Sequence, residues 1–412
     1  MDSLAQAKEL LKKGLDPSLF ATPLEKSLKI GDTRKALTIG VPKEHLFQER
    51  RVSLTPGSVA VLVANGHEVM IEHNAGAASH FSDRDYSEAG AKIAYTPQEV
   101  FTNNEIIVKI APPNQTELDF CQTRQTLISA VHIANLTSEY LKVLINKNIT
   151  ALGFEFLLAT DGSTPLVRMM SEIAGISSIH IASELLSSHP NAKGILLGGI
   201  TGVPPATVTI IGAGTAGFYA CRTALGLGAS VKVIDEEIHK LKRLEEVLGQ
   251  KIYTAVSQQD YIANAVAGSD VLIGAAFKKG ARASCLVSDA MVQLMPEGSV
   301  IVDVAIDQGG CIETSRITTH ENPTYLEHGV IHYCVPNIAS RVARTASQSI
   351  SNILGPLVLK IGEAGGIKNI IATNRNIKSG IYVYHKHITQ RSLATMLNLD
   401  WMDIDLLHAA QL

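Results

Sequence analysis

The stretch TVTIIGAGTAGFYACRTALGLGASVKVID, residues 207–235, decides the fold of this chain. An apolar run leads into three spaced glycines, and a helix-length segment then leads to a second apolar run that ends at Asp235. In this spacing Gly212 permits a tight strand-to-helix turn, Gly214 lets the backbone approach a pyrophosphate, and Gly217 lets helix and strand pack closely. An acid at the position of Asp235 bonds the ribose hydroxyls. The stretch predicts a dinucleotide-binding βαβ unit.

The residues after this acid indicate which dinucleotide is bound. Glu236 and Glu237 follow Asp235, and no arginine stands there to accept a 2′-phosphate. NAD is therefore favoured over NADP. A glycine turn without a ligand is the alternative that the spacing alone leaves open.

Alternating strand and helix patterns extend over most of the chain and predict parallel sheets with helical crossovers. The segment around the glycine loop contains six strand candidates: TVTIIG, SVKVID, KIYTA, DVLIGA, SVIVDV and VIHYC. From Leu37 an earlier array contains short β-rich runs separated by helix-length segments: LTIGV, TPGSVAVLVANG, EVMIEH, EIIVKIA, TLISAVHI and TALGFEF. A helix that starts near Met169 and ends before Pro190 connects the arrays, and the helical segment after Cys334 returns the chain to the first one.

The predicted fold class is α/β, with two doubly wound αβ domains. Residues 169–344 form a central Rossmann-type NAD domain with its linking helices, and residues 37–168 and 345–412 form a discontinuous substrate domain. Residues 1–36 form a helical N-terminal extension. A division into domains is expected because single cores seldom grow beyond roughly 250 to 300 residues, and the chain has 412.

Composition excludes several classes of function. A formal net charge of −3 without a basic block argues against a nucleic-acid partner and favours small molecules. Five scattered cysteines without CxxC spacing argue against a disulfide framework or a structural zinc site, so we expect no metal and a reducing cytoplasm. No signal peptide and no run of roughly 18 apolar residues is present, so no membrane association is expected.

Polar residues at the ends of predicted strands are candidates for chemistry, because open sheets bind ligands at the carboxyl ends of their strands. Arg50 and Arg51 follow LTIGV, and a guanidinium there can hold a carboxylate with two hydrogen bonds. His132 lies at the end of the strand in TLISAVHI, where it can move a proton or polarise a carbonyl. Lys109 lies at the end of the strand in EIIVKI, and Asp307 ends the fifth strand of the nucleotide array. Each residue alone has a structural alternative: a solvated charge, a core histidine, a lysine reaching water or a turn former.

Four motifs in order resemble the alanine dehydrogenase family, which is related to the nucleotide-binding part of proton-translocating nicotinamide nucleotide transhydrogenase. They are GVPKEHLFQERRVSLTP, the SEIAG helix, GAGTAGFYA and VDVAIDQGGCIETSR, and the resemblance extends from about Leu37 to about Ser351. It implies a reversible oxidative deamination of L-alanine to pyruvate and ammonia with hydride transfer to NAD. It also implies a homo-oligomer, either a hexamer or a dimer.

The resemblance also implies roles for individual residues. Arg51 corresponds to the arginine that holds the substrate carboxylate, and His132 to the histidine that acts on the substrate oxygen. Asp307 corresponds to the acid that assists at the imine and carbinolamine stages. Ser171 corresponds to a residue that contacts the cofactor phosphates, and Asp235 to the ribose acid.

Two positions depart from the family pattern. Ala111 stands where the family has its substrate-binding lysine, and Lys109, two residues earlier, is the substitute we expect to bind substrate. The segment NIASRVARTAS, which begins at Asn337, replaces a proline-bearing segment next to the nicotinamide, and Asn337 is expected to contact the cofactor.

These departures leave the substrate open. One alternative is a related amino-acid or opine-type, saccharopine-like dehydrogenase. Two others are a soluble transhydrogenase-like protein that binds NAD and a catalytically inactive NAD sensor. The presence of both His132 and Asp307 favours a dehydrogenase over the last two.

Overall fold

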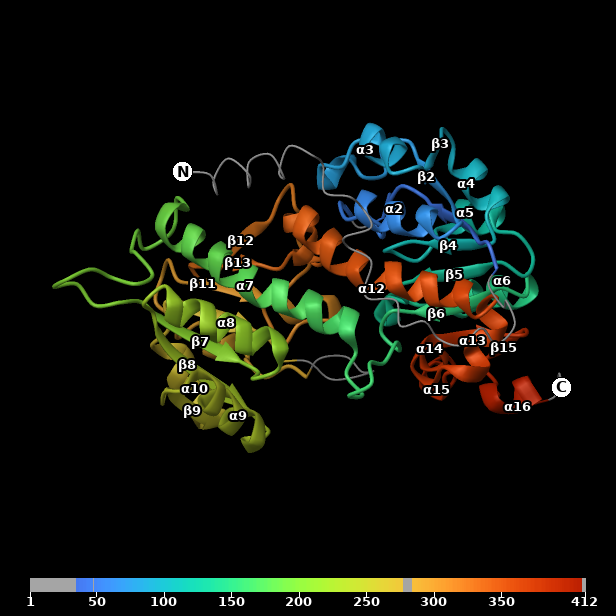
Figure 1. Ribbon diagram of the computed structural model, residues 1–412. Coiled ribbons are helices and arrows are strands. Elements are labelled where there is room, and N and C mark those ends of the chain that lie inside the picture. The colour runs from blue at the N-terminus through green and yellow to red at the C-terminus, as the bar shows by residue number, and fades with distance from the viewer. Residues whose placement is uncertain (1–34, 47, 277–283, 410–412) are drawn as a thin grey trace, which may run out of the picture.

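The computed structural model describes residues 35–46, 48–276 and 284–409, which form two α/β domains joined by long helices (Figure 1). The predicted helix of the N-terminal extension lies outside the described residues. Within these residues no helix has the length and apolar character needed to cross a membrane.

The first domain is built on a sheet that has eight strands in the described residues, in the order β15-β14-β6-β5-β4-β1-β2-β3. The six strands from β1 to β6 are parallel, and β14 and β15 are antiparallel additions at one edge. The bounds are β1 Thr38–Val41, β2 Glu68–Glu72, β3 Lys92–Ala94, β4 Ile106–Val108, β5 Thr126–Ser129, β6 Thr150–Gly153, β14 Ile381–Tyr384 and β15 His387–Ile388. Because β14 and β15 come from the end of the chain, this domain is discontinuous, as predicted.

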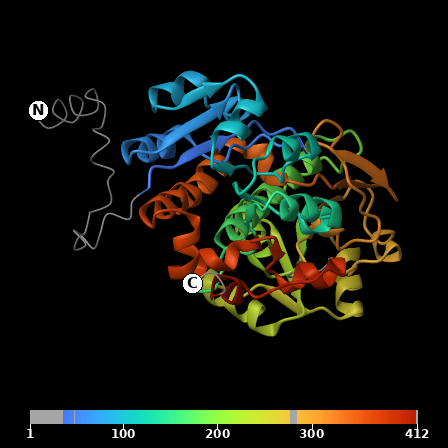
Figure 2. The same ribbon diagram turned by 90° about the vertical axis from the view of Figure 1, so that its right-hand side faces the viewer.

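Helices follow most of these strands and supply the crossovers that parallel pairing requires. Side-chain caps from Ser82, Thr96, Asn114 and Thr137 begin four of them. The helices are α2 Pro56–Ala64, α3 Asp83–Glu88, α4 Pro97–Asn103, α5 Gln115–Phe120, α6 Ser138–Asn146, α13 Ile367–Thr373, α14 Arg375–Gly380, α15 Arg391–Leu397 and α16 Ile404–Ala409. Helices α13 to α16 lie together at the end of this domain that faces the reader in Figure 2.

The second domain is built on a sheet whose described strands have the order β12-β13-β11-β10-β7-β8-β9. Without β12, this is the doubly wound dinucleotide order, with the reversal beside β7. The strands are β7 Thr207–Ile211, β8 Ser230–Asp235, β9 Tyr253–Val256, β10 Val271–Gly274, β11 Val300–Asp303, β12 Thr324–Glu327 and β13 Val330–Tyr333. The helices between them are α8 Thr215–Gly226, α9 Ile238–Leu248, α10 Gln259–Ala267 and α11 Asp289–Val292. All six predicted strands are present, and the antiparallel edge strand β12 was not predicted.

Two long helices, α7 Pro165–Ser188 and α12 Ala343–Glu363, connect the domains and pack against each other (Figure 1). Helix α7 begins at Pro165 rather than near Met169, because proline at the first helical position loses no intrahelical hydrogen bond. The predicted domain limits at residues 169 and 345 thus fall inside these helices.

Short 3₁₀ turns carry several of the candidate residues. They are η2 Ala77–Ser79, η3 Ile133–Asn135, η4 Val304–Gln308 and η5 Ile338–Val342. The last two follow strands of the second sheet, and η3 follows a strand of the first.

Candidate functional site

The glycine loop between β7 and α8 has the geometry that its spacing predicts. Gly212 has φ +108°, and a Cβ atom there would lie 2.5 Å from the carbonyl oxygen of Ala275. A Cβ atom at Gly217 would overlap the carbonyl oxygen of Gly212, whereas one at Gly214 would meet no atom within 4 Å. Gly212 and Gly217 therefore serve close packing, and Gly214 leaves the space that a phosphate group needs beside the start of α8.

Helix α7 lies directly on the first turns of α8. A Cβ atom at Gly175 would overlap the carbonyl oxygen of Ala216, so the two helices are in close contact at this point. Ser171 precedes Gly175 by four residues and therefore lies on the same face of α7, toward the glycine loop. This position supports the predicted contact of Ser171 with cofactor phosphates.

Asp235 ends β8 beside the same loop and is buried. Its Oδ2 accepts a hydrogen bond of 2.6 Å from the N–H of Ala213, and its Oδ1 accepts one of 2.8 Å from the N–H of Glu237. The carboxylate thus holds the glycine loop in place, and its remaining lone pairs are available to the predicted ribose hydroxyls.

Arg51 lies in the loop after β1 and is buried. Its Nε and Nη2 donate to the two carboxylate oxygens of Glu49 at 2.7 and 2.5 Å. Its Nη1 lies 3.1 Å from the sulfur of Met170, which is the neighbour of Ser171 on α7. Burial disfavours the charged guanidinium, but the attraction and hydrogen bonds of Glu49, with smaller contributions from Glu44 and Asp307, together outweigh burial and raise the pKa of Arg51. The pairing with Glu49 leaves the Nη1–Nη2 edge as the one that can hold a substrate carboxylate.

Asp307 does not end the fifth strand, as the sequence suggested. Strand β11 ends at Asp303, whose carboxylate accepts from the N–H groups of Ala305 and Cys311 at 3.0 and 3.1 Å and so forms the turn. Asp307 lies one turn further on, in η4, where its side chain is accessible to solvent. Its carboxyl group is nevertheless surrounded by protein on several sides, and this burial raises its pKa to about 6. Because Asp303 stabilises the turn, the carboxylate of Asp307 is not required for it.

His132 comes three residues after the end of β5 and has a left-handed backbone, with φ 50°. Glu155 fixes this conformation, because its carboxylate accepts from the N–H groups of Val131 and His132 at 2.9 to 3.0 Å. Burial lowers the pKa of His132, and the positive charge of Arg51 lowers it further. The imidazole is therefore neutral near neutral pH, as a proton carrier or hydrogen-bond donor to a carbonyl requires.

Lys109 directly follows β4, but two acids hold its ammonium group. Its Nζ donates to Glu117 at 2.7 Å and lies 3.4 Å from Glu44. Burial opposes its charge, and these two carboxylates outweigh burial and raise its pKa. Glu44 also attracts Arg51, so one carboxylate is shared between the surroundings of the arginine and of the lysine. Substrate binding by Lys109 therefore stays a prediction.

Glu44 links this lysine to the position of the expected substrate lysine. It accepts from the N–H groups of Ile110 and Ala111 at 2.6 and 3.3 Å. Burial raises the pKa of Glu44 to about 7, although Lys109 opposes this. The side chain of Ala111 is buried and uncharged, so position 111 supplies no cation for a substrate.

Asn337 connects the two domains at this cluster. It has a left-handed backbone, with φ 60°, just before η5. Its N–H donates to Asp307 Oδ1 at 3.0 Å, and its side-chain Nδ2 donates to Glu49 Oε2 at 2.8 Å. The structure thus brings Arg51, His132, Asp307 and Asn337 together, while Ser171 and Asp235 lie with the glycine loop.

The sequence did not single out the carboxylates Glu49, Glu44, Glu155 and Asp303. An acid alone carries no pattern, and Glu49 was passed over although it stands two residues before Arg51. The pair E-x-R in a loop at a strand end was the available signal, because residues two apart on extended backbone share a face.

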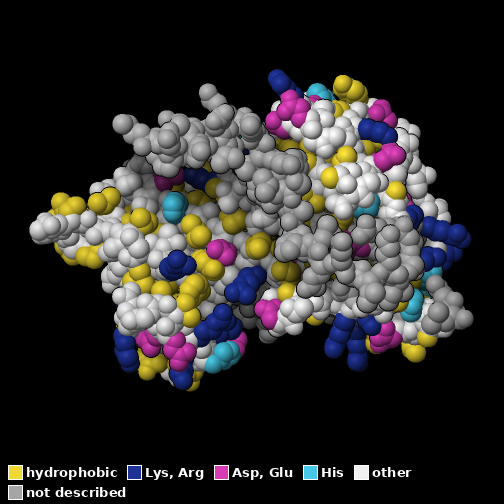
Figure 3. Space-filling view, viewed as in Figure 1, with side chains coloured by type: hydrophobic (Ala, Val, Ile, Leu, Met, Phe, Trp, Pro, Cys, Tyr) yellow, Lys and Arg dark blue, Asp and Glu magenta, His cyan; other side chains and the backbone are white. Residues whose placement is uncertain are grey.

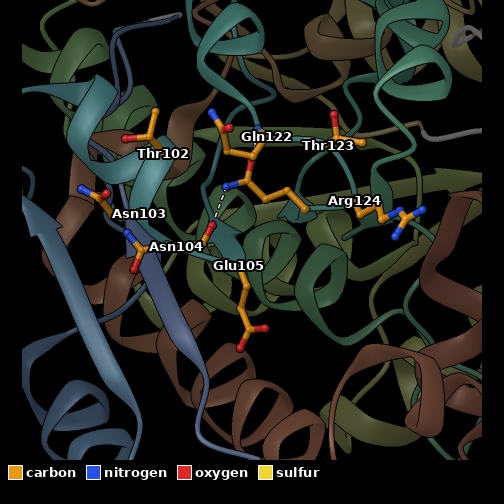
Figure 4. A pocket seen from close by; sticks show the side chains of 8 residues that line it. Thr102, Asn103, Asn104, Glu105, Gln122, Thr123 and Arg124 are labelled. Carbon is orange, nitrogen blue, oxygen red and sulfur yellow. Dashed lines mark hydrogen bonds between the residues drawn. The ribbon is translucent and has the colours of Figure 1, made fainter.

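A surface pocket of about 270 Å³ lies at the amino ends of β4 and β5 (Figure 4). None of its lining residues belongs to the strand-end cluster. Asn104, Glu105, Arg124 and Gln125 line it, just before the first residues of β4 and β5. Gln125 Nε2 donates to the carbonyl oxygen of Asn104 across it at 2.6 Å. Ligands of open sheets bind at the carboxyl ends of strands, so the strand-end cluster remains the candidate site.

A glycine loop at the sheet reversal, with an arginine, a histidine and an acid close to one another beside it, defines a nucleotide-dependent dehydrogenase. Comparison with known families agrees. The model described as "Alanine dehydrogenase/PNT, N-terminal domain" matches residues 40–174, and the corresponding C-terminal domain model matches residues 178–391. The chain belongs to the alanine dehydrogenase/PNT family.

Individual relatives support this assignment. The chain is 41% identical over 366 residues to an alanine dehydrogenase of Methanococcus maripaludis, covering 89% of this chain and 98% of the relative. It is 39% identical over 370 residues to one of Staphylococcus epidermidis, covering 90% and 99%. A solved L-alanine dehydrogenase superposes with a TM-score of 0.83 at 38% identity, covering 88% of this chain and 99% of that one. A transhydrogenase from Sinorhizobium meliloti, at 23% identity and a TM-score of 0.73, shares the fold, covering 86% and 99%.

Proposed function

We propose that the protein catalyses the NAD-dependent, reversible oxidative deamination of L-alanine to pyruvate and ammonia. The observation that carries this proposal is the proximity of Arg51, His132 and Asp307, contributed by both domains, beside a complete dinucleotide loop. When bound, NAD accepts a hydride from the α-carbon of the substrate. Ser171, Asp235 and the glycine loop are the residues that would hold it, and the open space at Gly214 fits a phosphate.

The residues of the cluster divide the remaining chemistry. Arg51 holds the substrate carboxylate with its free Nη1–Nη2 edge and so orients the α-carbon. Asp307, as a carboxylate, removes a proton from the water that attacks the imine carbon and returns it to the leaving amine. His132 bonds the oxygen that this water delivers, which is a hydroxyl in the carbinolamine and a carbonyl in pyruvate. The net reaction converts alanine, NAD⁺ and water into pyruvate, ammonium, NADH and a proton.

A panel of substrates tests the proposal. L-amino acids are supplied with NAD, and 2-oxo acids with ammonium and NADH, while NADH absorbance is followed. We expect turnover with alanine and with pyruvate plus ammonium. Turnover only with a carboxyalkyl amino acid would instead support the opine-type alternative. Two observations favour testing it: Ala111 replaces the expected substrate lysine, and Lys109 is paired with Glu44 and Glu117.

We assign the substrate to the domain formed by residues 37–168 and 345–412 and NAD to residues 169–344. The position of Arg51 and His132 after β1 and β5, and of the glycine loop after β7, supports this division. We also place the enzyme in the cytoplasm, and the five cysteines, each free in the described structure, support a reducing compartment.

We further propose that the enzyme is a homo-oligomer. The segment 195–204 projects from the second domain and closes on itself through the bridge between Ile200 and Val203 (Figures 1 and 3). The side chains of Leu196, Ile200 and Val203 are 61%, 66% and 56% exposed, and a projecting apolar group of this kind is typical of an interaction surface. A second copy of the chain is the occupant we propose.

Molar mass from light scattering tests this assembly. We expect a dimer or hexamer for the wild type and a smaller species for Ile200→Glu. A monomeric wild type would refute the oligomer without bearing on the reaction.

A further inference from the structure

We infer that Glu49 is a positioning residue that assembles the proposed catalytic site across the two domains by holding both Arg51 and Asn337. This inference rests on the proposed function and deepens it. It assigns to Glu49 no contact with substrate or cofactor. Its role is to determine where Arg51 and the loop that carries Asn337 lie.

Glu49 is the most heavily hydrogen-bonded side chain of the cluster. Besides the two bonds from the Arg51 guanidinium, it accepts from the N–H groups of Arg50 and Arg51 at 3.1 and 2.9 Å. It also accepts from Asn337 Nδ2 at 2.8 Å and from Ser340 Oγ at 3.1 Å. Burial alone would raise the pKa of Glu49, but Arg51 and these donors lower it, so the group is a fixed anion.

The contact with Arg51 determines which part of the guanidinium is available. Glu49 occupies the Nε–Nη2 edge, so the planar group cannot rotate without breaking two charge-assisted hydrogen bonds. The Nη1–Nη2 edge is then presented in a single orientation. Without Glu49 the buried guanidinium would seek other acceptors, of which Glu44 and Asp307 are the acids that already attract it.

Through Asn337, Glu49 is connected to the proposed catalytic acid Asp307, which belongs to the other domain. The side chain of Asn337 bonds Glu49, while its backbone N–H bonds Asp307. A continuous series of contacts therefore runs from Arg51 through Glu49 and Asn337 to Asp307. Glu49 and Arg51 follow β1 of the first sheet, whereas Asp307 and Asn337 follow β11 and β13 of the second.

The loop that carries Glu49 has other anchors, so replacement of Glu49 should leave it folded. Hydroxyl groups at Ser340, Ser347 and Ser351 accept from the N–H groups of Arg50, Val52 and Thr55 at 2.7 to 2.9 Å. The bonds to Ser347 and Ser351 attach the loop to α12 independently of the carboxylate, whereas Ser340 also donates to Glu49.

The first test is Glu49→Gln, which keeps the size of the side chain and removes its charge. We expect KM for alanine and for pyruvate to rise by about tenfold or more, as for the loss of a charge-assisted hydrogen bond. The affinity for NADH, measured by fluorescence titration, should stay unchanged. Asp270→Asn is the matched control, because Asp270 likewise pairs with a cation, Lys193, and accepts the backbone N–H of Thr207, but lies away from the cluster.

The pH profile separates positioning from a simple charge effect. The N–H of Asn337 and the charges of Arg51, Asp303 and Glu49 all affect the pKa of Asp307. The charges of Arg51 and Glu49 affect the pKa of His132. Loss of the Glu49 charge alone would lower both pKa values. Displacement of Arg51, the stronger influence on both groups, would raise them, so we expect the acid limb of kcat/KM to move to higher pH. A limb that moves to lower pH with unchanged KM would overturn the inference.

The second test is Asn337→Gly, which serves even if Glu49→Gln does not fold. Glycine retains the N–H that bonds Asp307 and accepts the left-handed backbone, so that the side-chain bond to Glu49 is the contact removed. We expect a lower kcat/KM for alanine at saturating NAD, and a double variant no worse than Glu49→Gln. Additive losses would overturn the inference. A wild type without turnover would refute the proposed function itself.

Discussion

The nucleotide loop and the strand-end cluster are built in contrasting ways. The loop takes its glycines and its acid from one βαβ unit, residues 207–235, and its geometry follows from backbone contacts within that unit and with neighbouring β10. The cluster takes Arg51, His132 and Asp307 from distant segments. The carboxylates of Glu49 and Glu155 hold Arg51 and the backbone at His132, and the N–H of Asn337 bonds Asp307. We therefore expect the nucleotide loop to depend on one segment and the proposed catalytic cluster on several. Mutations in the loop should change NADH affinity, and mutations in the cluster should change turnover.

The largest expected effect is that of Asp307→Asn. Without a carboxylate to exchange protons with water and amine, turnover should fall by about 10²- to 10⁴-fold. NADH affinity should stay nearly intact, because the structure places Asp307 with the assembled cluster. Steady-state kinetics and NADH fluorescence titration measure the two quantities. Strongly weakened NADH binding would make Asp307 a cofactor ligand.

A matched pair of glycine variants should affect the other region. Gly217→Ala forces a Cβ atom against Gly212, so we expect a loss of about 1 to 3 kcal/mol in unfolding free energy together with weaker NADH binding. Gly214→Ala has room for its methyl group, so the unfolding free energy should hardly change while the NADH Kd rises. Denaturant unfolding and NADH titration of both variants give the result. Equal destabilisation would contradict the roles assigned to the two glycines.

Glu155→Gln should have a smaller effect on the cluster. The amide oxygen of the glutamine can still accept from the N–H of Val131 or of His132, but the hydrogen bonds to a charged carboxylate are lost. We expect kcat to fall by about tenfold, corresponding to roughly 1.4 kcal/mol, with unchanged NADH affinity. An unchanged kcat would show that the left-handed turn at His132 holds without this acid.

The smallest effect is a dependence on pH. Burial raises the pKa of Asp307 to about 6, so the carboxylate form loses population as the pH falls through that value. For alanine oxidation, kcat/KM should therefore be about half-maximal near pH 6 and decline further below it. This decline of kcat/KM at acid pH should be absent from the pH profile of the Asp307→Asn variant. A limb near the ordinary pKa of an aspartate would place another acid in this role.

Much of the fold could be predicted from sequence because buried parallel strands are continuous apolar runs. All six strands named for the second domain are present, and the return of the chain to the first domain is confirmed. The strands that were missed, β3, β12, β14 and β15, lie at or next to sheet edges. β3 and β12 are short and partly exposed, so their residues carry little apolar pattern.

The candidate site was predictable only in part. Residues at strand ends, such as Arg51 and His132, can be placed because parallel strands end at one edge of a sheet. The turn at Asp303, which moves Asp307 beyond β11, and the engagement of Lys109 by Glu44 and Glu117 depend on contacts between segments far apart in sequence. No local pattern encodes them.

The central claim is that the two regions act separately, and kinetics of Gly214→Ala and Asp307→Asn at increasing NAD test it most directly. We predict that saturating NAD restores the turnover of Gly214→Ala to near the wild-type value and restores none in Asp307→Asn. Turnover of Asp307→Asn that recovers with NAD, or a low plateau for Gly214→Ala despite saturation, would contradict the account.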